Sequence, residues 1–115
     1  KNIDPLIEYN HIFTMLQDFY FPKRYGSGLM AWSGDRKYIT DKFIISPEQH
    51  MKKYVTSQNW GDQAFIRDHV KEKIEIMQNI TPVRVGSYKV SHRRSSYNII
   101  CFHGKPRPRS VGWKV

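Results

Sequence analysis

The sequence predicts an α/β domain, and three observations carry this prediction. Short apolar runs rich in β-branched and aromatic residues, at 11–16 and 97–102, are typical of buried strands. Helical spacing of apolar residues at 36–45, with helix-start signals at 46–49 and 60–63, indicates a helical section between them. The length of 115 residues and the 14% aromatic content suit one small domain with a packed core.

The first quarter of the chain predicts a short helix followed by a strand. Asp4 can cap the helix, and Pro5 suits its first position. The strand follows at 11–16, and residues 17–24 then form an irregular loop that carries aromatic side chains. Asp18 in this loop is either a ligand or acceptor contact, or the cap of a turn.

Two glycines flank Ser27 just before an apolar run at 29–32. They predict a turn, and such a turn can bring backbone N–H groups close to a ligand. The alternative is an ordinary tight turn. The stretch is not a Walker loop, because no Gly-Lys-Ser/Thr follows it.

The middle of the chain predicts three helices. In the second, Ser46 is expected to cap with Gln49 as its capping-box partner, and His50 is expected to be solvated. Asp62 falls in the first turn of the third helix, where an acid is favoured electrostatically, so it has a structural explanation as well as a functional one. Residues 74–80 fit either a short strand or a helical turn.

At the end of the chain, residues that could bind a ligand follow directly after a predicted strand. After an alternating segment at 83–90, the strand at 97–102 stops at His103, and a Lys-Pro-Arg-Pro segment follows. In open α/β sheets, ligands bind beyond strand ends. One metal-capable nitrogen with two cations suits a metal-bound phosphate. The alternative is a basic loop in which His103 is merely hydrogen-bonded.

Charge and cysteine content limit the partners. Residues 76–115 carry eight Lys or Arg and no acid, so their balance is +8 of the net +9, and an anionic partner is expected. The single cysteine, Cys101, is expected in the core, which suits a reducing, cytoplasmic compartment. No apolar run reaches the ~20 residues that span a bilayer, and no signal peptide is recognisable. The chain lacks an initial Met, as expected for a piece of a longer protein.

Several stretches together resemble one enzyme family. The chain is similar to the C-terminal half of nucleotide-sugar glycosyltransferases of the GT-A fold, most of all the glycogenin-like retaining enzymes and their bacterial and phage relatives. The resemblance covers nearly all of residues 1–115. It implies one partial domain, a mixed sheet flanked by helices, whose nucleotide-binding part is absent. It is carried by Asn2-Ile3-Asp4-Pro5-Leu6, Tyr25-Gly26-Ser27-Gly28-Leu29-Met30-Ala31-Trp32, Asp62-Gln63, Ser87-Tyr88-Lys89 and His103-Gly104-Lys105-Pro106-Arg107-Pro108.

The resemblance implies transfer of a sugar, with retention, from a nucleoside-diphosphate sugar to a carbohydrate or other hydroxyl acceptor, with Mn²⁺ or Mg²⁺. Two departures stand out: Gly26 replaces the family Asn, and the histidine loop is shorter, which leaves open whether Lys105 or Arg107 replaces the family lysine. The resemblance implies that Asp62 and Gln63 lie at the reacting sugar and that Ser27 and Gly28 lie on the sugar or acceptor side. It implies that Gly104, Lys105 and Arg107 lie at the leaving phosphates. His103 is implied to bind the metal.

Two further expectations complete the sequence-based picture. One histidine and two cations do not make a metal site, so little or no transfer is expected from these residues alone. The alternative function is a small nucleic-acid-binding module, in which the basic C-terminal part tracks phosphates and its aromatic side chains stack on bases. The sequence lacks a recognisable reader motif for that role. The stacking residues would be Tyr88, Tyr97, Phe102 and Trp113.

Overall fold

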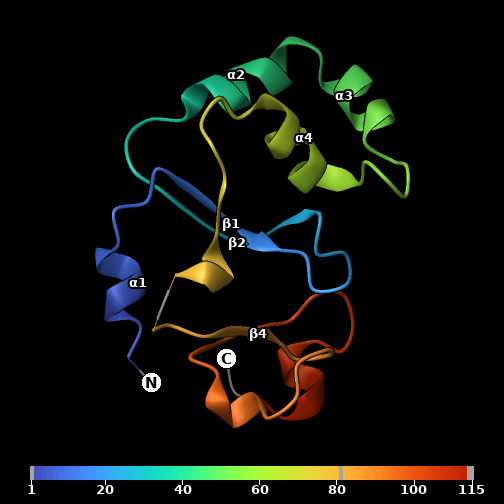
Figure 1. The fold of residues 1–115 in the computed structure, drawn as a ribbon. Coiled ribbons are helices and arrows are strands. Elements are labelled where there is room, and N and C mark those ends of the chain that lie inside the picture. The colour runs from blue at the N-terminus through green and yellow to red at the C-terminus, as the bar shows by residue number, and fades with distance from the viewer. Residues whose placement is uncertain (1, 81, 114–115) are drawn as a thin grey trace.

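The computed structural model describes residues 2–80 and 82–113, which form a small mixed α/β fold in three tiers (Figure 1). Helices lie at the top, a three-stranded sheet lies in the middle, and a two-stranded sheet with the C-terminal turns lies at the bottom. The α/β class predicted from sequence is confirmed. Among the described residues, no helix has the length and apolar character needed to cross a membrane.

The middle tier is a mixed sheet in the order β2-β1-β3. Its central strand β1 (Phe13–Gln17) pairs antiparallel with β2 (Tyr25–Trp32) and parallel with β3 (Glu75–Ile76). The 3₁₀ turn η1 (Met77–Asn79) follows β3 directly, so residues 74–80 contain both a strand and a helical turn. Four of the five β1 residues are buried, as expected for an apolar strand with neighbours on both sides.

The turn predicted around Ser27 is wrong, because residues 25–32 form one continuous strand. The pairing of β1 with β2 shifts between Met15 and Leu16, which pair with Met30 and Gly26. A Cβ at Gly26 would lie 3.5 Å from Cβ of Leu16, and one at Gly28 would lie 3.7 Å from its Cδ1. The glycines therefore mark an irregular strand that packs closely against Leu16.

The top tier consists of α2 (Lys37–Ile45), α3 (Pro47–Lys53) and α4 (Gly61–His69). Its small core holds Tyr54, Ala64 and Phe65, with Phe43 packed against them. The predicted capping box at Ser46 does not form, since the Ser46 side chain makes no cap hydrogen bond. His50 is not solvated as expected: its ring stacks on Phe43, and its Nε2 lies 3.0 Å from the Lys42 carbonyl oxygen.

Tyr54 ties this core to α4, because its hydroxyl donates to Oδ2 of Asp68 at 2.8 Å. Burial, followed by this hydrogen bond, raises the pKa of Tyr54 to about 12. An unfolded tyrosine titrates near ~10. The stabilisation that follows from the shift is therefore complete below pH ~10 and is lost as the pH rises toward 12.

We expect Tyr54→Phe to show a smaller loss of stability than the native chain when the pH rises from 9 to 12. The shift corresponds to roughly 2–3 kcal/mol that only the native chain can lose over this range. Urea unfolding of both proteins at several pH values measures the difference. Parallel pH profiles would show that Tyr54 ionises normally in the folded state.

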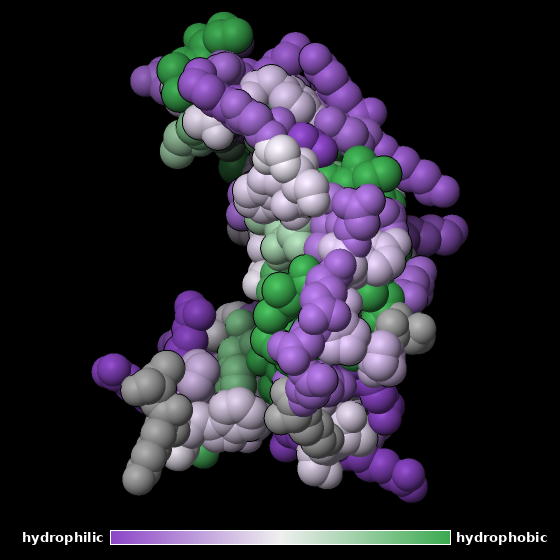
Figure 2. Space-filling view, turned by 90° about the vertical axis from the view of Figure 1, so that its left-hand side faces the viewer, coloured by the Kyte–Doolittle hydropathy of each residue, from purple (hydrophilic) through white to green (hydrophobic). Residues whose placement is uncertain are grey.

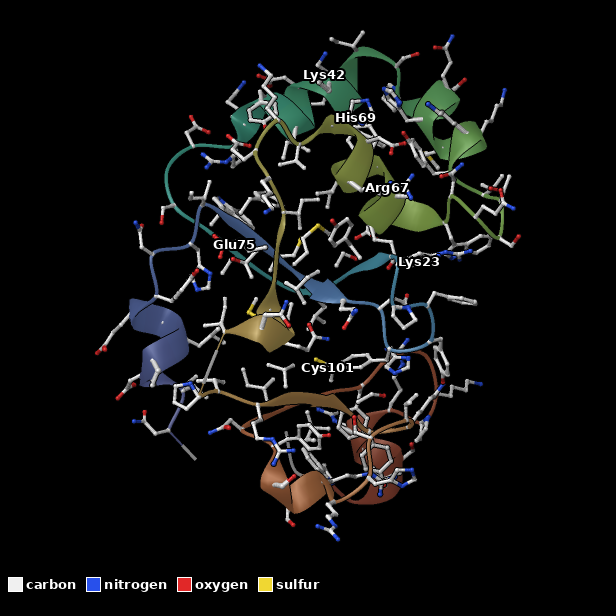
Figure 3. The ribbon with its side chains drawn as sticks, viewed as in Figure 1. Lys23, Lys42, Arg67, His69, Glu75 and Cys101 are labelled. Carbon is white, nitrogen blue, oxygen red and sulfur yellow. The ribbon has the colours of Figure 1, made fainter. Side chains whose placement is uncertain are left out.

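The bottom tier holds the parallel pair β4 (Val85–Ser87) and β5 (Ile99–Cys101), with η2 (Arg94–Ser96) between them and η3 (Pro108–Val111) after them. The larger core of the protein lies between this tier and β1. It buries Leu16, Met77 and Val85, with Ile99 and Cys101 packed against them. Figure 3 shows Cys101 in this central position, and burial raises the pKa of its thiol, in agreement with the core role predicted for it.

Helix α1 (Asp4–Glu8) lies beside these two tiers (Figure 1). Asp4 does not cap it, because the helix already begins at Asp4 and Ile3 holds the cap position. Buried His11 joins the helix to β1: its Nε2 donates to the Leu6 carbonyl oxygen, and its Nδ1 lies 2.7 Å from the Thr14 hydroxyl. This histidine has a structural role.

Candidate functional site

A cavity of about 420 Å³ lies where the three tiers meet. Figure 2 shows the molecule hollowed on one side between the helical tier and the bottom tier. Gln63 of α4 lies on one side of the cavity, and the strand end at His103 lies on the other. The lining residues come from the end of β1 and the following loop, from β2, and from β5 and its continuation: they include Gln17, Asp18, Phe19, Tyr20, Ser27, Gly28, Cys101 and Phe102.

Asp62, which the resemblance places at the reacting sugar, and Ser27, which it places on the sugar or acceptor side, are hydrogen-bonded to each other in the structure. The Ser27 hydroxyl donates to Oδ1 of Asp62 at 2.9 Å, and the same oxygen accepts the backbone N–H of Gln63 at 2.8 Å. This contact ties β2 to the first turn of α4. Gln63 and Ser27 line the cavity, whereas Asp62 lines an apolar hollow beside it with Phe43 and Phe65. The Asp62 carboxylate therefore joins β2 to α4 from outside the cavity.

The ring of His103 is fixed on several sides. Its Nε2 lies 2.6 Å from Oγ of Ser87. The ring stacks on Phe19 at 5.6 Å between centroids and meets Tyr20 edge-on at 5.4 Å. Burial and the nearby charge of Lys89 lower the pKa of His103, against the opposing charge of Asp18. The imidazole is therefore favoured in its neutral form.

Asp18 lies on the cavity wall but also has the structural role considered for it. Its Oδ1 accepts the backbone N–H groups of Tyr20 and Phe21, at 2.8 and 2.9 Å. The carboxylate thus caps the turn after β1. This turn places Phe19 and Tyr20 against His103, so Asp18 shapes the cavity through its neighbours and lines it directly.

The predicted phosphate-binding cations lie elsewhere. Lys105 and Arg107 are exposed, and neither lines the cavity. Lys89 lies near the strand end, because its Nζ is 3.3 Å from the position that a Cβ would take on Gly104. Gly104 has a φ of +66°, a conformation that favours glycine.

Ser87 and Lys89 were not selected as site residues from the sequence. The sequence signal that points to them is the Ser87-Tyr88-Lys89 stretch, which is among those that resemble the family. Their place beside His103 results from the pairing of two parallel strands, which brings the carboxyl ends of the strands to the same edge. Ser87 is aligned with Cys101 in the β4–β5 register. The residues after Ser87 and those after Cys101 therefore emerge side by side.

The described residues do not form a complete metal site. Across residues 2–80 and 82–113, no group of three or more His, Cys, Asp or Glu side chains is arranged to hold an ion. Mg²⁺ and Mn²⁺ prefer oxygen-rich shells, so one imidazole is an insufficient donor set. His103 fits such an ion only if other carboxylates join it.

The aromatic side chains of the nucleic-acid alternative are largely engaged with one another. Tyr88 stacks on Phe102 at 4.5 Å, and the Arg94 guanidinium lies 4.0 Å from the Tyr88 ring centroid. Tyr97 lies beneath the guanidinium of Arg84 at 4.9 Å. Bases that stack on these rings would have to displace contacts that already exist.

The chain matches no protein-family model, and comparison with curated proteins and with solved structures finds no match either. The geometry of the cavity brings Ser27, Gly28, Gln63 and His103 to one place and leaves Lys105 and Arg107 outside it.

Proposed function

We propose that this chain forms the sugar-binding wall of a glycosyltransferase that transfers a sugar from a nucleoside-diphosphate sugar to an acceptor hydroxyl. One observation carries the proposal. Residues from three distant segments, at 27–28, 63 and 103, line the same cavity, and all of them belong to the stretches that resemble GT-A glycosyltransferases. If these short motifs resembled the family only by chance, they would not be expected to line the same cavity.

The chemistry of the lining suits a sugar. Aromatic rings of Phe19 and Tyr20 provide apolar surface, and polar groups of Gln17 and Gln63 stand among them. A pocket of several hundred cubic ångströms with a few convergent polar groups is typical of small-molecule sites. A cavity of about 420 Å³ is within this range.

In this proposal, Asp62 and Ser27 set the distance between α4 and β2, and Gln63 contacts the sugar. Lys89, which lies beside Gly104, contributes positive charge at the strand end, where a diphosphate would depart, whereas Lys105 and Arg107 are exposed and do not line the cavity. Mn²⁺ or Mg²⁺ would supply Lewis-acid chemistry at that diphosphate when bound. Because the described residues lack its carboxylate ligands, no step is assigned to the ion here.

Titration with UDP-glucose and Mg²⁺, followed by amide NMR spectra, tests the proposal by binding, since turnover is not expected from these residues. We expect the amide resonances of Ser27, Gly28 and Gln63 to shift. Asp62→Ala removes the hydrogen bonds from Ser27 and from the backbone N–H of Gln63, and this loss of positioning at the cavity wall should weaken binding about five- to tenfold.

Asp41→Ala is the matched control, because Asp41 is an exposed carboxylate on α2 that pairs with Lys37 and does not line the cavity. It should bind like the native chain. A different result would favour the nucleic-acid alternative: no response to the nucleotide sugar, but salt-dependent shifts at residues 84–113 on addition of a random oligonucleotide.

A further inference from the structure

Ser87 is fully buried, so each of its hydrogen bonds must be made within the protein. Its Oγ accepts the backbone N–H of Lys89 and the backbone N–H of Val90, both at 3.2 Å. A hydroxyl oxygen has two lone pairs and one hydrogen. Both lone pairs are therefore occupied, and the hydrogen needs an acceptor.

The acceptor is Nε2 of His103, at 2.6 Å from Oγ. If Nε2 carried the proton instead, Oγ would face three donors, and its own hydrogen would be buried without a partner. Such an unsatisfied group costs about 1–3 kcal/mol. Ser87 thus selects the neutral tautomer of His103 in which Nδ1 holds the proton.

The second ring nitrogen is consequently the one available to a ligand. Within residues 2–80 and 82–113, Nδ1 of His103 has no hydrogen-bond partner. The contacts with Phe19 and Tyr20 hold the ring, which lines the cavity. A rigid ring with a committed Nε2 offers a fixed N–H donor and no free lone pair for a cation.

The cavity indicates what this donor meets. Among the described residues, no lysine or arginine lines it, and its one carboxylate is Asp18. Lys89 lies near His103 but does not line the cavity, so a phosphate inside the cavity would meet the Asp18 carboxylate with no cation in the lining. A neutral polyol can donate hydroxyl hydrogens to Asp18 and accept the proton of Nδ1.

We propose that His103 binds a neutral sugar through an Nδ1–H donor that Ser87 fixes, and that its Nε2 is not a metal ligand. The tautomer is inferred from hydrogen bonding alone. The identification of the ligand as a sugar rests on the glycosyltransferase proposed above, and it assigns to His103 a different role from the one that the family resemblance implies.

Long-range ¹H–¹⁵N correlation spectra of the native chain at neutral pH test the tautomer directly. We expect the pattern of a protonated Nδ1 and an unprotonated Nε2. Ser87→Ala should release this preference, while Ser95→Ala, which removes an exposed hydroxyl, should preserve it. A protonated Nε2 in the native chain would overturn the inferred tautomer but would not contradict the proposed function. This measurement uses the native chain, so it does not depend on whether Ser87→Ala folds.

Ligand titrations on the same spectra test the sugar assignment. Methyl glycosides of glucose, galactose and mannose are compared with inorganic pyrophosphate and with Mn²⁺. We expect at least one glycoside to shift the Nδ1 resonance saturably. Pyrophosphate and Mn²⁺ should leave this resonance unchanged. A response to pyrophosphate alone, selective broadening of His103 by Mn²⁺, or no response to any glycoside would overturn the assignment, and the last result would count against the proposed function as well.

Discussion

Replacing Met15 by alanine is expected to lower the free energy of unfolding by about 2–5 kcal/mol. Met15 is 0% exposed and lies in the central strand, where it is paired with Met30 on one side and Ile76 on the other. Truncation leaves a cavity that these neighbours can fill only in part. Domains of this size are stable by only about 5–15 kcal/mol, so the loss is a large share of the total.

Urea unfolding followed by circular dichroism measures this loss, and Met51→Ala is its control. Met51 has the same side chain but is 63% exposed on α3, so its truncation should change stability by less than about 0.5 kcal/mol. Equal effects of the two substitutions would mean that β1 is not the centre of the fold.

Replacing Phe65 by alanine is expected to cost about 3–5 kcal/mol and to loosen the helical tier in particular. The Phe65 ring contacts Phe43, Tyr54 and His69, at centroid distances of 5.5, 5.7 and 4.2 Å. Phe65 thus joins α4 to α2 through Phe43 and to the end of α3 through Tyr54. Once α4 loosens, Asp62 and Gln63 lose their fixed positions. The Phe65→Ala variant should therefore bind UDP-glucose more weakly as well as having a lower free energy of unfolding.

The matched control is Phe21→Ala, since Phe21 is 53% exposed and its main ring contact is with Arg24. Its effect on unfolding should be small. Amide spectra separate the two tiers: Phe65→Ala should broaden resonances at 37–69 and preserve those of β4 and β5. Uniform loss of all resonances would show that the helical tier does not loosen on its own.

Local sequence patterns predicted most of the elements of this fold. The strand expected at 11–16 is observed as β1, in which four consecutive residues are buried as an apolar run predicts, and the helix expected at 36–45 is observed as α2. The errors arise where tertiary contacts decide. Residues 25–28 look like a turn from their glycines, yet they form a strand because Leu16 needs room there.

The candidate site could be predicted only in part, for a similar reason. Ser27, Gly28, Gln63 and His103 were selected from motifs, and the cavity contains them. The roles of Ser87 and Lys89 depend on the parallel pairing of β4 with β5, and no local pattern encodes that pairing. Lys105 and Arg107 looked adjacent to the site because they are adjacent in sequence, but both are exposed, and of their segment it is Pro108 that lines the cavity.

The two walls of the cavity belong to two separate hydrophobic cores. Ligand binding in the cavity is therefore coupled to the stability of the contact between these two parts of the protein. Gln63 is held by the helical core around Phe65, and the His103 wall is held by the core that includes Leu16 and Val85. The contact between Ser27 and Asp62 bridges the two. A sugar that touches both walls must therefore act as a second bridge, and at saturating concentration it would suppress the independent opening of the helices by mass action.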